Sequence, residues 1–297
     1  MTQPLNKGSL FPEVLIPELI NLVKGESALA QLTGASPIPF NGSKEFTFTF
    51  DKEVDIVAES GAKSHGGVTI EPVTIMPLKF EYGARISDEF MYGSQEYQIN
   101  VLQAFSEGFA KKIARGIDIA AIHGFNPRTG VASALIGGNN FKSKITQIVE
   151  LTENPDNDME AAIALVEAAD GNISGAAFAP AFRSSLAALK DSTGRKLFPE
   201  LAWGQKVGSI NGLPVTSNPT IAFGGSGIRA IAGDFSNSFK WGYAKQIPMK
   251  IIEYGNPDND EVTGDLQGHN QIYVRAEAYV GWGILIPAYF ALIEAGE

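Results

Sequence analysis

Cysteine is absent from the sequence. This absence excludes a disulfide framework, a thiolate metal site and a cysteine nucleophile, and it fits a reducing compartment. Histidine is scarce as well: the chain has His65, His123 and His269, and none of them has a partner at the spacing of paired zinc ligands. We interpret each as a surface or helix-end imidazole rather than a metal ligand.

Basic residues are in deficit. Lys and Arg number 23 against 33 Asp and Glu, which gives a formal net charge of −10. Such a chain is not expected to hold duplex DNA by phosphate neutralisation, because that requires clustered cations. The same charge keeps copies of the chain soluble and opposes premature association.

Long apolar runs and targeting signals are also missing. Residues 1–10 contain a single basic residue, Lys7, with no apolar segment after it, and no run approaches the ~18 apolar residues that cross a bilayer. We therefore expect a protein made and kept in the cytoplasm, with no membrane partner.

No catalytic pattern is present. The glycine-rich stretch 224–229 lacks the Lys-Ser/Thr pair of a phosphate loop, and there is no G-x-S-x-G elbow. The carboxylates Asp258, Asp260 and Glu261 lack the ligand order of an EF-hand, so a solvated loop is the better interpretation than a calcium site. We predict no catalytic, cofactor-binding or metal-binding residues, and hence a structural role.

Two segments near the start of the chain expose apolar side chains in patterns that favour contact with another surface. An apolar stretch with Leu15 and Ile16 predicts an N-terminal arm that docks on its own core or on a neighbouring subunit. Residues 45–50 alternate strictly and place Phe46, Phe48 and Phe50 on one face of a strand.

Alternation resumes at Leu78 after a polar stretch over 51–67, which predicts a hairpin over residues 45–82. At about 3.3 Å per residue its limbs would reach about 60 Å, beyond a body of this size. An isolated ribbon is marginal in water, so it must lie on a second copy of the chain or fold back on its own sheet.

A long helix is predicted over residues 94–123, with Ser94 as N-cap and Gly124 as the stop. Apolar residues recur at spacings of three and four, at Ile99, Leu102, Phe105, Phe109, Ile113, Ile117 and Ala121. Later segments predict helices over 156–169 and from Pro180, a flexible loop tip at 224–227, and strands at 176–179, 239–243, 271–277 and 284–290. The fold class is therefore α+β.

Several short motifs occur in an order known from one family. They are Arg85-Ile86-Ser87-Asp88-Glu89-Phe90, the helix end Ile113–Gly124, the turn Leu189–Leu197, Asn211-Gly212-Leu213-Pro214-Val215 and Gly233-Asp234-Phe235. In this respect the chain resembles the major capsid proteins of tailed double-stranded DNA bacteriophages, which have the HK97-like capsid fold. The likeness covers nearly the whole chain.

The resemblance implies a division of the chain. The expected parts are an N-terminal arm over 1–32, an extended hairpin loop over 45–82, a peripheral domain over 33–44, 83–124 and 235–280 with its spine helix at 94–123, and an axial domain over 125–234 and 281–297. The expected contacts between subunits are Leu15 and Ile16 in the arm, Phe46, Phe48, Phe50, Lys52 and Lys63 in the hairpin, and Gly225 and Gly227 in an axial loop.

The resemblance also implies a function. Copies would assemble into hexamers and pentamers of an icosahedral shell that encloses double-stranded DNA without reading its sequence, in the host bacterial cytoplasm. Expected partners are further copies, a portal, and separate scaffolding or decoration proteins. Two alternatives stay open at this point: an encapsulin, which uses the same fold as a cellular compartment, and a cytoplasmic enzyme with an unrecognised site.

Overall fold

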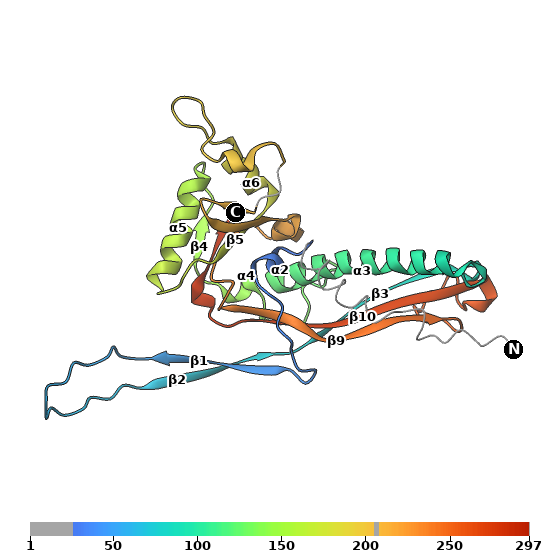
Figure 1. Cartoon of the computed structure of the whole chain (residues 1–297), viewed down its shortest axis with the longest axis horizontal. Coiled ribbons are helices and arrows are strands. Elements are labelled where there is room, and N and C mark those ends of the chain that lie inside the picture. The colour runs from blue at the N-terminus through green and yellow to red at the C-terminus, as the bar shows by residue number, and fades with distance from the viewer. Residues whose placement is uncertain (1–25, 205–207, 297) are drawn as a thin grey trace.

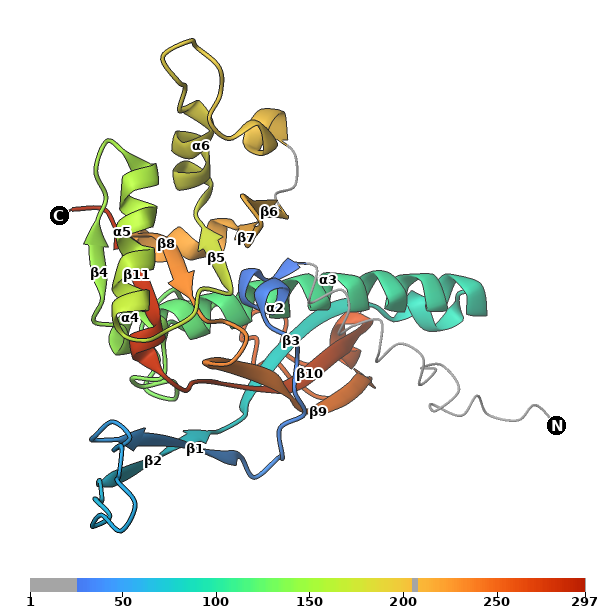
Figure 2. The ribbon, with the colours of Figure 1, turned by 60° about the vertical axis from the view of Figure 1, so that its left-hand side comes forward.

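The structure is a computed structural model, and it describes residues 26–204 and 208–296. Figure 1 shows an elongated molecule in which one long helix lies on a layer of strands. A lobe rises above one end of this layer, and a two-stranded ribbon projects beyond the same end. The turn of Figure 2 shows that lobe and ribbon lie on opposite sides of the layer.

The layer is an antiparallel sheet with the strand order β3-β10-β9, formed by β3 (Leu78–Ser87), β10 (Gln271–Ile284) and β9 (Phe239–Ile252). Two tryptophans, Trp241 and Trp282, are at most 1% exposed and belong to the same core cluster as Ile113 and Ile117 of the long helix. The strands predicted at 239–243 and 271–277 are confirmed as the first parts of β9 and β10.

The long helix α3 spans Gln95–His123, which confirms the predicted boundaries. The Ser94 hydroxyl accepts a hydrogen bond from the Tyr97 amide, and Gly124 ends the helix in a left-handed conformation with φ 71°. The predicted apolar stripe is buried from Leu102 onward except at Phe105, which is partly buried, but Ile99 is 43% exposed. The prediction for Ile99 is wrong because the first turns of α3 run past the packed core that covers its later turns.

The ribbon consists of β1 (Ser43–Phe50) and β2 (Val68–Ile75), paired antiparallel. The prediction that the segment from Leu78 is the second limb is wrong, since that segment is β3 and pairs with β10 instead. Pro77, between Ile75 and Leu78, has no amide to continue a ladder, and the chain changes sheet at this point. Eight paired residues reach about 26 Å, less than half of the predicted limb.

The lobe is built on a second sheet with the strand order β4-β11-β8-β5-β7-β6. Its strands are β4 (Ile148–Glu150), β5 (Gly175–Phe178), β6 (Ser209–Ile210), β7 (Leu213–Ser217), β8 (Ile228–Gly233) and β11 (Phe290–Glu294). Helices α5 (Pro155–Ala168) and α6 (Pro180–Ala188) share a core cluster with one face of this sheet, and the other face joins the core under α3. The lobe and the layer therefore share one continuous core.

The C-terminal strand lies later than predicted. Strand β10 ends at Ile284, a 3-10 turn follows over Pro287–Tyr289, and β11 begins at Phe290 in the other sheet. Because proline cannot continue a strand ladder, the apolar run 284–290 is divided between two sheets. The prediction of one strand over 284–290 is wrong, although it recognised the break.

The remaining elements are short. They are α2 (Ala28–Leu32), α4 (Phe141–Lys144) and the 3-10 segments η1 (Asp88–Tyr92), η2 (Pro199–Gly204), η3 (Pro219–Gly225), η4 (Gln267–His269) and η5 (Pro287–Tyr289). Helix α2 brings the N-terminal part of the described chain against α3 and the lobe, where Ala28, Leu29 and Ala30 are fully buried.

Candidate assembly surfaces

One face of the ribbon is apolar and bare. The antiparallel register sets Phe46 opposite Pro72, Phe48 opposite Ile70 and Phe50 opposite Val68, so all six side chains share one face. We call this set the Phe face. The exposed fractions are 57% for Phe46, 60% for Phe48, 70% for Phe50, 52% for Val68 and 54% for Ile70. A contiguous exposed patch of large apolar side chains indicates an interaction surface.

The opposite face fixes the base of the ribbon to its own subunit. Ile75 is fully buried and packs where Gly283 of β10 leaves room, since a Cβ on Gly283 would lie 2.7 Å from an Ile75 methylene carbon. The carboxylate of Glu45 pairs with the ammonium of Lys240 in β9 at 2.5 Å. The ribbon is therefore anchored at its base through the face that does not carry the phenylalanines.

The connection at the far end of the ribbon is exposed throughout. Asp51 closes it, because its carboxylate accepts a hydrogen bond from the Gly67 amide at 2.6 Å. Val54 is 93% and Ile56 is 97% exposed. Lys52 and Lys63, two predicted contacts, also lie here in the open. Their role between subunits stays a prediction.

Two other sets of predicted contacts have different outcomes. Leu15 and Ile16 lie outside the described residues. Gly225 and Gly227 have φ of 69° and 82°, values that favour glycine, and they flank Ser226, which is only 8% exposed. The Lys142 ammonium donates to the Ser226 carbonyl at 2.5 Å, so the predicted flexible tip is instead a closed turn packed near the end of α3. Their contact role stays a prediction.

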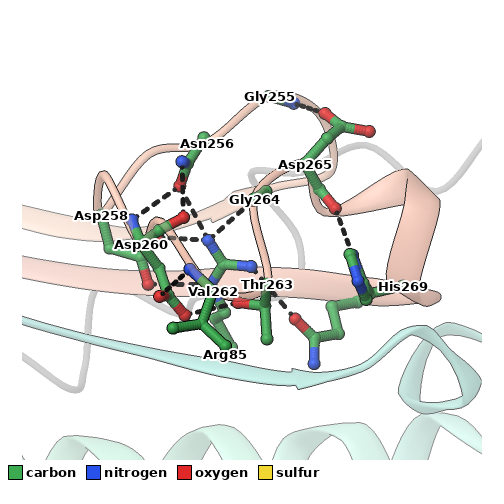
Figure 3. A network of polar contacts seen from close by, with 11 residues as sticks. Arg85, Gly255, Asn256, Asp258, Asp260, Val262, Thr263, Gly264, Asp265 and His269 are labelled. Carbon is green, nitrogen blue, oxygen red and sulfur yellow. Dashed lines mark hydrogen bonds and ion pairs between the residues drawn. The ribbon is translucent and has the colours of Figure 1, made fainter.

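A charged clamp, which lies at the end of the molecule opposite the ribbon, was not predicted from the sequence. Figure 3 shows Arg85 of β3 reaching into the loop between β9 and β10. Its guanidinium donates two bonds to the Asp258 carboxylate, at 2.5 and 2.8 Å, and one bond each to the Asn256 side chain at 2.8 Å and the Gly264 carbonyl at 2.9 Å. This guanidinium also lowers the pKa of Asp258. A bidentate, charge-assisted pair of this kind fixes geometry as well as adding energy.

The clamped loop displays apolar side chains at its rim. Val262 is 90% exposed and Tyr254 is 65% exposed. The loop beneath them is held by Arg85 and by hydrogen bonds that the Asp260 carboxylate accepts from the Val262 amide and the Thr263 hydroxyl. Because Arg85 holds the loop in one shape before any contact forms, little ordering cost would remain on association.

We expect Arg85→Lys to loosen this loop, since a lysine cannot reproduce the bidentate fork. Amide hydrogen exchange of residues 255–264 should accelerate several-fold, while the free energy of global unfolding should change little, because the lost contacts lie within one loop. Arg275→Lys, in the same sheet but paired with Glu277, is the matched control. Unchanged exchange in Arg85→Lys would contradict the clamp.

A buried carboxylate joins segments that are far apart in sequence. Asp118 of α3 is fully buried and accepts bonds from the Ser27 hydroxyl at 2.5 Å, the Ala28 and Leu29 amides at 2.8 and 3.2 Å, and the Thr220 hydroxyl at 2.8 Å. Burial raises the pKa of Asp118, and these hydrogen bonds oppose the shift. Asp118 therefore pins α2 and η3 to the long helix.

His123 extends this connection at the end of α3. Its Nε2 lies 2.8 Å from the Thr220 carbonyl, which can only accept a hydrogen bond, so Nε2 carries a proton. The ring lies between Phe125 and Phe223, with centroids 5.8 and 6.4 Å away, and its buried Nδ1 has no partner among the described residues. Burial lowers the pKa of His123 below its ordinary 6.5, and the charge of Lys142 adds to this.

This arrangement predicts a pH dependence. Unfolded His123 binds a proton near pH 6.5, and folded His123 binds one only at lower pH because its pKa is lowered. The free energy of unfolding should therefore be highest above about pH 6.5 and decrease as the pH falls below it, by about 1.4 kcal/mol for every tenfold difference in proton affinity between the unfolded and folded states. His123→Gln should flatten this part of the profile. His269→Gln, at an exposed position, is the control variant that also removes one histidine.

Among residues 26–204 and 208–296, no group of three or more His, Asp or Glu side chains is arranged to hold a metal ion. Over the same residues, no helix is both long and apolar enough to cross a bilayer. The described chain combines an exposed apolar ribbon face, a clamped loop and a long helix, and the ribbon face is typical of a surface that another chain covers.

Comparison with known proteins identifies the kind of assembly. Residues 7–295 match the family model described as the phage capsid family. This chain belongs to the phage capsid family, and it is a structural major capsid protein with the HK97-like fold. A search of curated proteins found no match.

Solved structures agree. A chain from Mycobacterium phage Ogopogo is 33% identical, with 91% of this chain and 92% of that chain covered and a TM-score of 0.77. A chain from Gordonia phage Cozz is 27% identical, with coverage of 91% and 86% and a TM-score of 0.72. The capsid of an empty GTA particle shares the fold at 15% identity, with coverage of 92% and 90% and a TM-score of 0.60. These matches favour the phage capsid over the encapsulin and enzyme alternatives.

Proposed function

We propose that copies of this chain form hexamers and pentamers of an icosahedral shell, and that the ribbon of each copy lies over a neighbouring copy through its Phe face. The observation that supports this most directly is the contrast between the two faces of the ribbon. One face anchors it to its own subunit through Ile75 and Glu45, while the phenylalanines of the other face stay more than half exposed.

Burying the Phe face against a neighbouring copy would contribute several kcal/mol to the free energy of association. Fully burying a large apolar side chain contributes about 1.5–3 kcal/mol, so covering the exposed part of each would contribute about 1 kcal/mol. Five such side chains contribute about 5 kcal/mol to each contact between copies, which offsets a substantial part of the roughly 4–15 kcal/mol entropic cost of association.

In this proposal the parts of the chain have separate roles. The lobe with the sheet β4-β11-β8-β5-β7-β6 is the axial domain, at the centre of each ring. The layer of α3 with β3, β9 and β10 is the peripheral domain, whose Arg85 loop lies at the rim. Residues 26–32, which include α2, are the described end of the arm that is expected over residues 1–32.

We further propose that the shell assembles in the cytoplasm of a bacterial host, with a portal and separate scaffolding or decoration proteins, and that it encloses double-stranded DNA. The net charge of −10 supports a wall that keeps packed DNA off most of its surface.

The direct test is electron microscopy of the purified chain, expressed alone and together with proteins encoded beside it. Closed shells, or rings with five- and six-fold symmetry, are the expected result. A monomer under every condition, confirmed by light scattering, would overturn the assembly proposal.

A further inference from the structure

The most prominent part of the lobe is a turn that neither the ribbon nor the clamp involves. It follows α6 and precedes η2, and Figures 1 and 2 show it projecting from the end of the lobe that is farthest from the layer. We call residues 189–197 the basic turn. Its sequence is Leu-Lys-Asp-Ser-Thr-Gly-Arg-Lys-Leu.

The basic turn has a fixed shape. The Asp191 carboxylate accepts bonds from the Thr193 amide and hydroxyl at 2.8 and 2.7 Å and from the Arg195 amide at 2.9 Å. Gly194 takes φ of 83°, where a side chain would be strained. Leu189 and Phe198 at the base pack against the core of the lobe. The turn is therefore organised before any ligand arrives.

Its charges are unbalanced. Lys190 and Lys196 face each other as an antiparallel bridge pair, and Arg195 is the next residue along. All three side chains are exposed, and among the described residues none of them forms an ion pair with a carboxylate. Asp191, the only acidic residue of the turn, is occupied by the turn itself.

This arrangement costs stability without a ligand. Like charges placed directly opposite on paired strands repel each other. Here they occur on a chain whose overall charge is −10, so a region of opposite sign is concentrated on one projecting turn. A preorganised group of unpaired cations is suited to bind an anion, and lysine ammonium and arginine guanidinium groups both bind the oxygens of phosphate.

We propose that the basic turn binds phosphate groups, and that turns from several copies converge on one polyphosphate or polynucleotide at the centre of each ring. This inference rests on the proposed function, because it needs the lobe to lie at the ring axis. Closing a ring would bring the cations of several copies together, and a bound polyanion would neutralise them. Rings of Lys and Arg side chains attract anions in the same way in anion-selective pores.

The test uses assembled shells, first verified by electron microscopy. Binding of tripolyphosphate is measured by equilibrium dialysis over a series of salt concentrations, for the wild type and for the Lys190→Gln/Lys196→Gln double variant. The matched control is Lys111→Gln/Lys112→Gln, which removes the same charge from two exposed positions on α3. A short single-stranded oligonucleotide and a polyglutamate peptide are used as competitors.

Wild-type shells should bind tripolyphosphate, and the double variant should bind at least about tenfold more weakly, with a smaller salt slope, while the control binds as the wild type does. If the oligonucleotide displaces tripolyphosphate, a polynucleotide is identified as a natural ligand of the basic turn. If it does not, free polyphosphate is the ligand that the result supports.

Three results would overturn the inference. They are wild-type shells that bind no tripolyphosphate, a double variant that binds as tightly as the wild type, and polyglutamate that binds more tightly than tripolyphosphate, which would assign the turn to an acidic protein segment. If shells form but do not bind, only this inference fails. If no shells form, the proposed function fails and the inference fails with it.

Discussion

A single charge on the Phe face, Phe48→Asp, is expected to produce a folded subunit that does not assemble. Phe48 is 60% exposed in the free subunit, so replacing it should change the free energy of unfolding by no more than about 0.5 kcal/mol. In the shell the same position would be covered by a neighbour, and an unpaired carboxylate buried there costs several kcal/mol, roughly 2–7 for a polar group without a partner. Light scattering and electron microscopy should therefore show monomers or small oligomers in place of shells.

The neighbouring residue supplies the control. Thr49 is also exposed but points to the opposite face of β1, where its partner in the ladder is Thr69. Thr49→Asp adds the same charge to the same strand, and we expect shells in close to wild-type yield. Equal assembly of both variants would show that the Phe face is not an interface. Equal failure of both would show that charge anywhere on the ribbon blocks assembly, irrespective of face.

The ribbon also shows what the sequence could predict. The alternation of residues 45–50 was sufficient to place Phe46, Phe48 and Phe50 together, because side chains in a strand alternate between two faces. Likewise, the boundaries of α3 were predictable because Ser94 and Gly124 are local signals that act within one turn of the helix.

The partner of β1 was not found, and the reason is physical. Residues 68–75 also alternate, but Pro72 lies within them and argues against a central strand. The ribbon has only two strands, so both edges are open and a proline is tolerated. The segment from Leu78 alternates more clearly, but it is β3, an edge strand whose partner is β10. Nothing in the local sequence distinguishes a strand that pairs with β1 from one that pairs with β10.

The buried connections were beyond local patterns altogether. Arg85 and Asp258 are 173 residues apart, and Asp118 and Thr220 are 102 apart, so only the folded topology brings them together. One signal was available: Asp118 is an acidic residue within the most apolar part of α3, where residues 116–123 are all buried. An ionisable residue in such a run must be bonded to something, although the sequence does not say to what.

The contacts of Asp118 lead to the largest expected effect on stability. Asp118→Ala would leave the amides of Ala28 and Leu29 and the hydroxyl of Ser27 without the Asp118 acceptor in a fully buried site, while the Thr220 hydroxyl keeps the Asn218 side-chain oxygen as an acceptor. Each unsatisfied buried donor costs about 1–3 kcal/mol, so the free energy of unfolding should fall by about 3 kcal/mol or more. Urea denaturation of the unassembled Phe48→Asp background would measure this without interference from shells.

Asp158→Ala is the control for Asp118→Ala, because it measures the stability lost when a buried aspartate with only local hydrogen bonds is removed. Asp158 is 4% exposed and bonds the amide and hydroxyl of Thr152, which is six residues away, at 2.8 and 2.7 Å. A local contact of this kind at a helix start contributes about 1 kcal/mol. Asp118→Ala should also accelerate amide exchange at Ala28 and Leu29, whereas Asp158→Ala should not, because of the two aspartates it is Asp118 that bonds the amides of α2. If both variants lose the same stability and exchange in α2 stays slow, then α2 is held by its apolar packing, and the carboxylate does not pin it.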